Sequence, residues 1–569
     1  MDWTRSYQQV FFAIYLLLCV ATALSFYLRR NADEMKTPDE AKDVDSKDQR
    51  PEWIGVCILL GIAFLLRIWK FGIIPGGMNQ DGAMAAVDAK ALADYGTDRF
   101  GMFMPVHFTA WGYGQMSVFL SYCMIPFIKL FGVSAVTARL PILMASMAGL
   151  LGLWGIGRKL LGTSGGLILL AFATVNPWHF LQSRWALDCN MFPHVFLLGL
   201  CFLLFGLEKK KFFLFFSMVF FACSMYCYGI AFYTVPLFLT VFGIYLILKK
   251  LVGWKDFFCC VFLYFVLSWP IYLTMMINAF GWKTIRTPFC TMAYFPESIR
   301  SNDILFIGAD KGTRFWENLR SLVEVYRRGD NLPWNTVPGY GSVTACFLPF
   351  ALLGLIRIAA LFWREKDERK KAGYLSVLLF FGIANLSGCI TARVNVNRVN
   401  LLFYALIFLT GAGMEFVWKY LKKFSWMITL GYLLISFLFL HTYFTTHAKT
   451  LEYYYFDQFI KAVRFAEEKV PNAKYCITPV VRGKESAANT AEILTLFAQE
   501  VDAEFYQGKI LDANGFSYRE KYQYRLVADE EKLDREVVYV ITQNDSQRPI
   551  WQNCILFPCG DYCIAVVEK

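Results

Sequence analysis

The longest apolar stretches of this sequence contain almost no charge. Only 18% of the 569 residues are charged, while 57% are apolar and the mean hydropathy is +0.41. Acidic side chains are missing from the cores of these stretches, and Arg67 lies near an end, where a long side chain can reach water. Acids inside a bilayer usually mark proton or ion pathways. Their absence argues against a proton-coupled transporter.

Other missing sequence features exclude further classes of protein. There is no CxxC-type metal pattern, and most of the 16 cysteines lie inside apolar stretches as small fillers. Cys554, Cys559 and Cys563 are close enough in sequence to pair in an oxidising compartment, or to stay packed thiols. No fixed-period repeat is visible, which weakens an inverted-repeat transporter. The net charge of +11 comes from Lys and Arg between apolar stretches, so it is an orientation signal and predicts no nucleic-acid partner.

Apolar stretches of membrane-spanning length recur along most of the chain. A helix needs about 20 apolar residues to cross a hydrocarbon core of about 30 Å. The first, 9–28, is long for a signal peptide and lacks a small-x-small cleavage site, so we interpret it as an anchor. The predicted spans are 9–28, 53–71, 137–157, 164–181, 191–207, 212–228, 231–248, 257–277, 341–361, 373–391, 398–418 and 425–444.

The segment 113–131 is also apolar and decides the sidedness of the rest. If it does not cross, the basic turns at 158–159, 209–211, 249–255, 364–371 and 419–423 all face one side, which the positive-inside rule makes the cytoplasm. We therefore expect 113–131 to be an interfacial or re-entrant helix. The loops on the opposite side, and the tail after residue 445, are then extracytoplasmic.

Three regions follow from this pattern. Residues 1–52 form an anchor helix and a cytoplasmic, disordered linker (29–52), and residues 53–444 form the multi-pass membrane domain. Residues 445–569 change to a pattern of amphipathic helix and short strands, which predicts a small α/β domain. The fold class is an α-helical polytopic membrane protein with about 12 spans and a small extracytoplasmic domain.

The acids gather in the outward loops. The segment "NQDGAMAAVDAKAL" (79–92) brings Asp81 and Asp88 just after an apolar span, and Asp188 follows in the next outward loop. Acids at this level suit chemistry at the membrane–water boundary rather than transport through the midplane.

At this point a resemblance becomes specific. The first outward loop opens with an acid, "LFGVSAVTARLPILMASMAGLLGLWGIGRKLLG" (130–162) follows, and "NPWHFLQSRWALDCN" (176–190) carries a second acid. This order resembles the protein O-mannosyltransferase and lipid A aminoarabinose transferase superfamily, membrane glycosyltransferases of the C-type fold. The resemblance covers the layout of residues 53–444 and is sharpest over 73–190.

The resemblance implies transfer of a sugar from a polyprenyl-phosphate donor to a hydroxyl on a lipid, a glycan or a protein, with Asp81 as base. A glycosyl phosphate already has a good leaving group, so a carboxylate that deprotonates the acceptor is the missing part. The alternative is that Asp81 only caps the following helix. The family often has Asp-Glu here, whereas this chain has Asp81-Gly82, so we expect no firmly bound metal and no other cofactor.

Further site residues come with alternatives. The resemblance places Asp188 opposite Asp81 in the cavity. Arg184 would contact the donor phosphate or pair with Asp188. His179 would hydrogen-bond a sugar or be a satisfied histidine at the interface, and Asp88 would face the cavity or be a solvated surface acid.

The donor phosphate needs cationic partners, and arginine suits bidentate contacts. The segment "TARVNVNRVN" (391–400) supplies Arg393 and Arg398 where a span re-enters, and the resemblance supports one of them as phosphate anchor. The alternative is that either arginine only stabilises the end of the span among lipid headgroups.

The main hypothesis is therefore an integral membrane glycosyltransferase, expected to be inverting. A flippase for a lipid-linked sugar is the first alternative, supported by the number of spans. A non-catalytic scaffold whose tail binds partners is the second.

Overall fold

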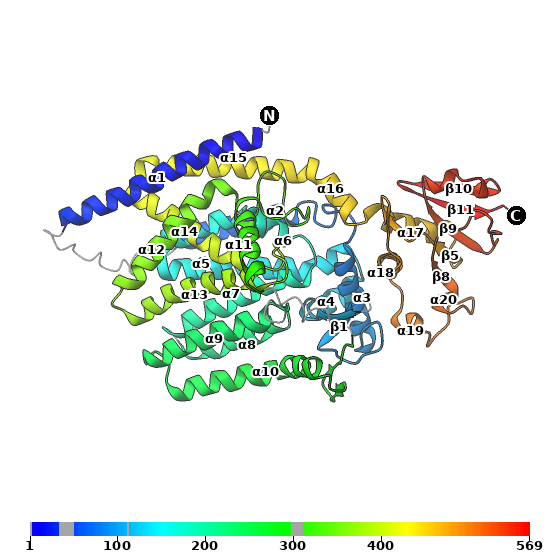
Figure 1. The fold of residues 1–569 in the computed structure, drawn as a ribbon, viewed down its shortest axis with the longest axis horizontal. Helices are drawn as coiled ribbons and strands as arrows, with labels where there is room; N and C mark the ends of the chain where they lie inside the picture. Colours follow the sequence, from blue (N-terminus) through cyan, green and yellow to red (C-terminus); the bar gives the residue numbers. More distant parts are fainter. Residues whose placement is uncertain (1–2, 34–49, 111–112, 209, 297–310, 569) are drawn as a thin grey trace.

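The computed structural model describes residues 3–33, 50–110, 113–208, 210–296 and 311–568. Most of the predicted linker therefore lies outside the described residues. Within them, ten helices are long and apolar enough to cross a membrane. The long helices run side by side as a bundle (Figure 1). They are α1 (Trp3–Asp33), α2 (Arg50–Ile68), α5 (Ala135–Thr174), α7 (Asp188–Gly206), α9 (Ala231–Leu248), α10 (Trp254–Phe280), α12 (Leu348–Arg364, preceded by η3, Ala345–Phe347), α13 (Glu368–Ile390), α14 (Leu402–Tyr420) and α15 (Ser425–Phe444, preceded by η4, Lys422–Phe424).

Two differences from the predicted spans have local causes. Helix α5 has a non-helical residue, Gly162, with φ +80°. A Cβ on Gly157 would lie 3.2 Å from the Cα of Gly166, so the two halves of α5 fold back on each other as two of the predicted passes. Helix α8 (Phe212–Met225) has only 14 residues, about 21 Å, and is short for a span.

One end of the bundle collects the basic turns. Ion pairs join the turns across this end: Arg158–Glu52 at 2.6 Å, Lys159–Glu208 at 2.5 Å, Lys211–Asp256 at 2.6 Å and Lys249–Glu368 at 3.4 Å. The prediction that the basic turns share one side is thus confirmed for 158–159, 209–211, 249–255 and 364–371, and it stays a prediction for 419–423. We call this the far end, and the opposite end, which carries residues 445–569, the domain end.

The first loop at the domain end is mixed in structure. It contains α3 (Gln80–Tyr95), an antiparallel hairpin of β1 (His107–Ala110) and β2 (Tyr113–Ser117), and α4 (Phe119–Phe131). The prediction of one helix over 113–131 is wrong, because its first five residues pair as a strand. The remaining helix of 13 residues is about 20 Å long, too short to cross.

Short elements complete the loops at this end. They are α6 (Pro177–Gln182), the two-stranded β3 (Ile285–Arg286) and β4 (Thr291–Met292), and α11 (Lys311–Arg328). Helix α6 separates from α5 because Asn176 caps it and Pro177 takes its first position, where a missing N–H costs nothing. The predicted span 164–181 therefore ends at Thr174.

The tail forms a five-stranded mixed sheet in the order β10-β11-β9-β5-β8. Strand β5 pairs in parallel with β8 and β9, and β11 pairs antiparallel with β9 and β10. The three cysteines Cys554, Cys559 and Cys563 are free thiols here. The elements are α16 (Thr446–Tyr454), α17 (Asp457–Lys469), β5 (Lys474–Ile477), β6 (Val480–Arg482), β7 (Glu485–Ser486), α18 (Ala488–Ala498), α19 (Ala503–Tyr506), α20 (Tyr518–Lys521), β8 (Tyr522–Tyr524), β9 (Val537–Thr542), η5 (Asp545–Gln547), η6 (Pro549–Trp551), β10 (Cys554–Cys559) and β11 (Tyr562–Val567).

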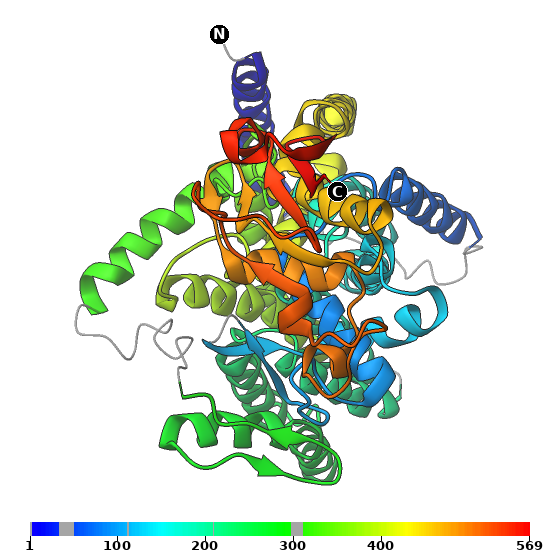
Figure 2. The same cartoon turned by 90° about the vertical axis from the view of Figure 1, so that its right-hand side faces the viewer.

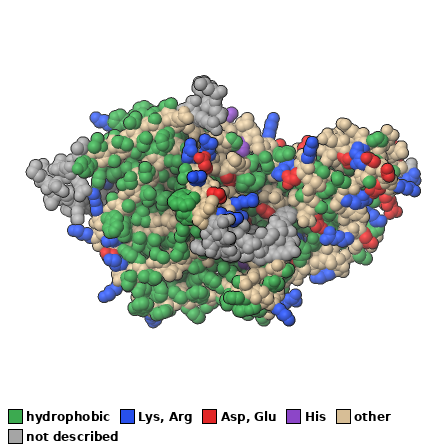
Figure 3. Space-filling model, in the orientation of Figure 1, with side chains coloured by type: hydrophobic (Ala, Val, Ile, Leu, Met, Phe, Trp, Pro, Cys, Tyr) green, Lys and Arg blue, Asp and Glu red, His purple; other side chains and the backbone are tan. Residues whose placement is uncertain are grey.

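The tail sits directly on the first loop (Figure 2). Helix α18 packs against α3. The Tyr95 hydroxyl donates to Asp502 at 2.7 Å, and the Gln507 side chain donates to the Arg99 carbonyl at 3.2 Å. The space-filling view shows a broad hydrophobic band over the bundle, while charged side chains gather over the tail (Figure 3). This distribution suits a bundle in lipid and a tail in water.

Candidate functional site

Asp81 lies in the first turn of α3, and its side chain is half-buried. The helix begins one residue earlier, at Gln80, and its N-cap is Asn79, whose side-chain oxygen accepts the Gly82 N–H at 2.8 Å. The alternative that Asp81 is the helix cap is therefore wrong. A carboxylate in the first turn does gain from the positive end of the helix dipole.

Arg184 fastens the start of the first loop. Its fully buried guanidinium donates to five backbone carbonyls and to the Tyr443 hydroxyl. The bonds reach Trp69 and Ile74 at 2.9 and 2.8 Å, Leu66 and Lys70 at 3.3 Å, and Arg67. The last carbonyls of α2 have no partner within the helix, and Arg184 supplies one.

Two predictions for Arg184 change as a result. It forms no ion pair with Asp188 in the described structure, so that alternative is wrong. Its donors already bind protein acceptors, and four aromatic rings, Phe71, Phe180, Tyr443 and Phe444, lie 5.4–6.0 Å from the guanidinium carbon. The geometry makes Arg184 an organiser of the loop rather than a phosphate ligand.

Arg139 of α5 holds the next part of the same loop. It is fully buried and donates to the carbonyls of Pro75 at 2.8 Å and Gly77 at 2.6 Å. The tail adds a third hold, because the Tyr455 carbonyl accepts the Met78 N–H at 2.8 Å. The backbone leading to Asp81 is thus fixed from α5, from the second loop and from the tail.

Two glycines allow these close approaches. Gly77 has φ +65°, and a Cβ there would lie 2.3 Å from the Tyr455 carbonyl oxygen. A Cβ on Gly82 would lie 2.6 Å from the Ala186 carbonyl oxygen. Position 82 therefore has no room for the second acid that the family often carries, and the start of α3 abuts the segment leading to Asp188.

Asp188 begins α7, is buried, and accepts the Cys189 N–H at 2.7 Å. The re-entry segment 391–400 is tied to this place by Asn400. The Asn400 side chain donates to the Cys189 carbonyl at 3.0 Å and accepts the Trp178 indole N–H at 2.6 Å. The structure thus brings together the three segments that carry Asp81, Asp188 and Arg398.

The two arginines of the re-entry segment differ in environment. Arg398 is half-buried, and its backbone N–H donates to the Asn395 side chain at 2.9 Å. Arg393 is exposed. Either role proposed for them, phosphate anchor or stabiliser of the span's end, stays a prediction.

His179 lies in a fully buried chain of hydrogen bonds. Arg67 donates to its Nδ1 at 2.8 Å, because a guanidinium can only donate. Nε2 must then carry the proton and donate to the Tyr404 hydroxyl at 2.9 Å, which donates to His194 Nδ1 at 2.7 Å. Burial, reinforced by Arg67, lowers the pKa of His179 well below its usual value. This geometry favours the satisfied histidine over a sugar ligand.

Asp88 is fully buried and forms an ion pair with Arg99, whose backbone N–H it also accepts at 3.1 Å. The alternative of a solvated surface acid is wrong, and the contacts assign it to the interior of the first loop rather than to the cavity. Nearby Asp98 is also buried and accepts the Phe100 and Met102 N–H groups at 3.0 and 2.8 Å. Burial and the Asp88 carboxylate raise the pKa of Asp98 to about 7.

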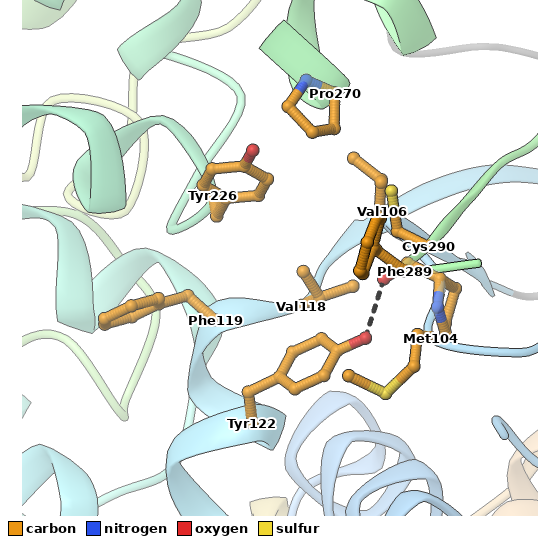
Figure 4. A pocket seen from close by; sticks show the side chains of 10 residues that line it. Met104, Val106, Val118, Phe119, Tyr122, Tyr226, Pro270, Phe289 and Cys290 are labelled. Atoms are coloured by element: carbon orange, nitrogen blue, oxygen red, sulfur yellow. Dashed lines mark hydrogen bonds between the residues drawn. The ribbon is translucent and has the colours of Figure 1, made fainter. Parts of the chain in front are cut away.

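A cavity of about 240 Å³ lies beside the first loop (Figure 4). Its wall is mostly apolar, and the Tyr122 hydroxyl donates to the Pro105 carbonyl at 3.1 Å across one side. Asp81 and Asp188 are not among its lining residues. Among the described residues no three His, Cys, Asp or Glu side chains are grouped as metal ligands, and the expectation of no bound metal stays a prediction.

Sequence reasoning missed several of these residues. Arg139 stands in the quoted "TARLP" stretch, but nothing in its spacing shows that it binds carbonyls of residues 75–77. Asn400 and Tyr404 carried no motif signal. A buried arginine in an otherwise apolar span was the one available hint, because such residues need partners.

No protein-family model matches this sequence, and no curated protein matches it either. Solved structures do match in fold. ArnT from Cupriavidus metallidurans in the apo state has a TM-score of 0.51 and 11% identity, over 91% of this chain and 98% of that chain. The same protein bound to undecaprenyl phosphate has a TM-score of 0.55 and 9% identity, over 90% and 97%.

An archaeal protein shares the fold as well. The Archaeoglobus fulgidus oligosaccharyltransferase, tethered to an acceptor peptide containing the NVT sequon, has a TM-score of 0.52 and 12% identity, over 92% of this chain and 74% of that chain. The predicted class, a polytopic helical membrane protein of the C-type glycosyltransferase fold with a small C-terminal α/β domain, is therefore confirmed. About 12 spans were predicted, whereas ten helices of the described residues are long and apolar enough to cross, and the extracytoplasmic side stays a prediction.

Proposed function

We propose that this protein is an integral membrane glycosyltransferase that moves a sugar from a polyprenyl-phosphate donor to an extracytoplasmic hydroxyl. The observation that carries the proposal is the placement of Asp81. It lies at the domain end, on backbone held by Arg139, Arg184 and Tyr455, beside the segment that carries Asp188. Fixed placement of a base is what proximity catalysis requires. The fold shared with ArnT bound to undecaprenyl phosphate supports a lipid-phosphate donor.

In the proposed reaction, the acceptor oxygen attacks the anomeric carbon while the bond from that carbon to the phosphate oxygen breaks. The acceptor proton passes to the Asp81 carboxylate, and the polyprenyl phosphate leaves with the bonding electrons. Attack opposite the leaving group inverts the configuration. Arg398, with Arg393 nearby, would stabilise the phosphate, and Asp188 would orient the reacting groups.

The test is removal of the Asp81 carboxylate in cells. Cells lacking the gene receive the wild type, Asp81→Asn, or Asp94→Asn, and mass spectrometry follows one-sugar mass differences in lipids, cell-wall glycans and proteins. Asp94 is the matched control, because it is an exposed acid at the other end of α3, paired with Lys90 at 2.7 Å. We expect Asp81→Asn to lower the product by about 10²-fold or more, with equal amounts of protein in the membrane. Full product from Asp81→Asn would refute the assignment.

The proposed side of the membrane has its own test. A membrane-impermeant amine reagent on intact cells should label Lys484 of the tail and leave Lys255 of the far end unlabelled, since both side chains are exposed. The reverse pattern would put Asp81 in the cytoplasm.

The flippase hypothesis predicts a different product. Proteoliposomes with a labelled lipid-linked sugar would then show movement between leaflets and no new glycosidic bond. Within the described spans, Glu415 of α14 is an acid that pairs with Arg357 of α12, which leaves its charge neutralised rather than open to a proton path. The scaffold hypothesis predicts full biological activity of Asp81→Asn.

A further inference from the structure

A cavity of about 960 Å³ opens at the domain end between α1, α11 and α12. It is separate from the residues of the proposed active site, none of which lines it. Its floor includes the loop that follows α11, and the Gln8 side chain of α1 donates across to the Gly339 carbonyl at 2.6 Å. Helix α1, packed against this loop, therefore closes one side of the cavity.

One wall of the cavity is basic. It is formed by Arg327 and Arg328, the last residues of α11, both more than half exposed. Glu324 lies beside them, 2.9 Å from an Arg327 nitrogen and 3.7 Å from an Arg328 nitrogen. Two guanidinium groups offer ten N–H donors in total, so Glu324 leaves most of these donors available. The carboxylates of Glu324 and of the cavity-lining Asp330 together balance the two positive charges.

Two further titratable groups that line the cavity, Asp330 and His447, are already engaged. Asp330 accepts the Leu332 N–H at 3.1 Å and the Val396 N–H at 2.9 Å. His447 bonds the Pro333 carbonyl at 2.8 Å through Nε2, which must therefore be protonated. Burial lowers the pKa of His447, so the ring adds no charge. The anion-binding capacity of the cavity thus rests on the two arginines.

The opposite wall is apolar and follows the spans. Phe12 and Leu16 of α1 are 39% and 42% exposed, and Leu352 of α12 is 58% exposed. From Gln8 to Leu16 the helix rises about 12 Å. The cavity therefore runs from a basic rim down into the apolar band.

Helix α11 determines how deep in the membrane the basic rim lies. It runs across the direction of the spans (Figures 1 and 2) and packs on α13, with Tyr326 donating to Asn385 at 2.6 Å. Its buried side includes Leu322 and Val325, while Trp316 and the arginines are exposed. A basic amphipathic helix in this position is typical of the membrane–water interface.

We propose that this cavity binds a phosphate-bearing membrane lipid, with the phosphate on Arg327 and Arg328 and the chains along Phe12, Leu16 and Leu352. The available guanidinium donors of the rim match the phosphate oxygens of a headgroup, and the apolar wall matches its chains. The proposal goes beyond the glycosyl transfer and does not depend on it.

A lipid bound in this cavity would affect the proposed active site through the loop of residues 330–336. The cavity-lining Asp330 accepts the Val396 N–H of the re-entry segment, and Asn335 accepts a hydrogen bond from Gln182 at 3.1 Å. A lipid on the other face of residues 330–336 would restrain this loop, and with it the segment carrying Arg398.

The test is native mass spectrometry of the full chain in detergent, with equal amounts of phosphatidylglycerol and phosphatidylcholine. We expect the wild type to retain phosphatidylglycerol in preference. Arg327→Gln with Arg328→Gln should weaken that retention about tenfold or more. Arg314→Gln is the matched control, because Arg314 is an exposed arginine of the same helix away from the cavity, and it should change nothing.

Further arms keep each outcome decisive. Leu352→Trp should fill the apolar wall and lower retention of phosphatidylglycerol. Equal retention of both lipids, or unchanged retention in the double variant, would overturn the proposal in favour of non-specific boundary lipid. Competition by inorganic phosphate at the same concentration as the lipid would overturn it in favour of a free-anion site. If the double variant unfolds, the two single variants replace it, and each should weaken retention.

Discussion

The two ends of the bundle hold arginines in different ways, apart from the Arg99–Asp88 ion pair in the first loop at the domain end. At the far end, arginines and lysines meet carboxylates, as in Arg158–Glu52 and Lys159–Glu208, and hold neighbouring turns together. At the domain end, Arg67, Arg139 and Arg184 are fully buried and donate to backbone carbonyls or to a histidine. Within the described part of the chain, none of these three forms an ion pair with a carboxylate.

The difference teaches how an arginine can be held in place without an ion pair. An ion pair would fix an arginine by neutralising an acid, whereas carbonyl acceptors fix it and shape the backbone at the same time. The first loop at the domain end is thus held in place, and within the residues that the structure describes none of the three buried arginines forms an ion pair with Asp81 or Asp188.

The largest effect should come from Arg184→Gln. The change removes most of the donors that bind five carbonyls, and each buried acceptor left without a partner costs about 1–3 kcal/mol. We expect a large drop in thermal stability in detergent and about a 10²-fold loss of transfer, since small misplacements of catalytic groups have effects of that size. Arg184→Lys should recover part of both, because it keeps the charge but not the planar fork.

Wild-type stability and transfer in Arg184→Gln would break the comparison. Equal stability and transfer in Arg184→Lys and Arg184→Gln would contradict the expected partial recovery, because the charge that lysine keeps would then contribute nothing.

Gly82→Ala should have the next largest effect. Its Cβ would lie 2.6 Å from the Ala186 carbonyl oxygen, so the first and second loops must move apart. We expect transfer to fall by about 10²-fold with a smaller loss of stability. Gly61→Ala in α2 is the control, because a Cβ there meets nothing within 4 Å, and it should be neutral or slightly stabilising. Full transfer by Gly82→Ala would show that the two loops need not touch.

The pH dependence of stability sharpens the comparison through Asp98. Its pKa of about 7 lies above that of an unfolded aspartate, about 3.9, so the folded protein binds more protons between these values. Stability should therefore fall as pH rises through about 4 to 7 and level off above. Asp98→Asn keeps an oxygen for the Phe100 and Met102 N–H groups and should remove this part of the fall.

The measurement is the thermal midpoint at pH 5 and pH 8 for both proteins. The drop between the two pH values should be larger in the wild type. An identical drop would show that Asp98 titrates normally.

The smallest effect should come from Lys211→Gln at the far end. The Lys211 side chain, paired with Asp256, is 72% exposed, and such exposed pairs contribute about 0–1 kcal/mol. We expect a shift of a degree or so in the midpoint and unchanged transfer. A loss comparable with that of Arg184→Gln would remove the distinction between the ends.

The sequence was informative wherever the signal is local. Apolar runs predicted the spans, and the basic turns predicted that 158–159, 209–211 and 249–255 share one side, as the ion pairs confirm. The strand at 113–117 was not predicted, because an apolar run of five residues is compatible with both a strand and a helix.

The site was predicted only in outline. Asp81 and Asp188 were proposed from their positions after apolar spans and from the resemblance, and their roles stay predictions. The structure places the segments that carry them side by side. The roles of Arg184 and Arg139 could not be predicted, because every residue has a backbone carbonyl and the sequence does not show which carbonyls an arginine binds. For the same reason Asp88 was expected at the cavity, whereas its partner Arg99 lies 11 residues away in an irregular segment.

The hydrogen bond from Met78 to the Tyr455 carbonyl has a consequence for how such proteins can be rebuilt. If a foreign domain were grafted after α15, the backbone leading to Asp81 would lose its hydrogen bond to Tyr455 and keep only those from Arg139 and Arg184. Chimeras should therefore keep this chain's own residues through Asp457 and exchange only the residues C-terminal to it. Any cut by a protease between Tyr454 and Asp457 should abolish the proposed transfer even though every side chain proposed for the reaction survives.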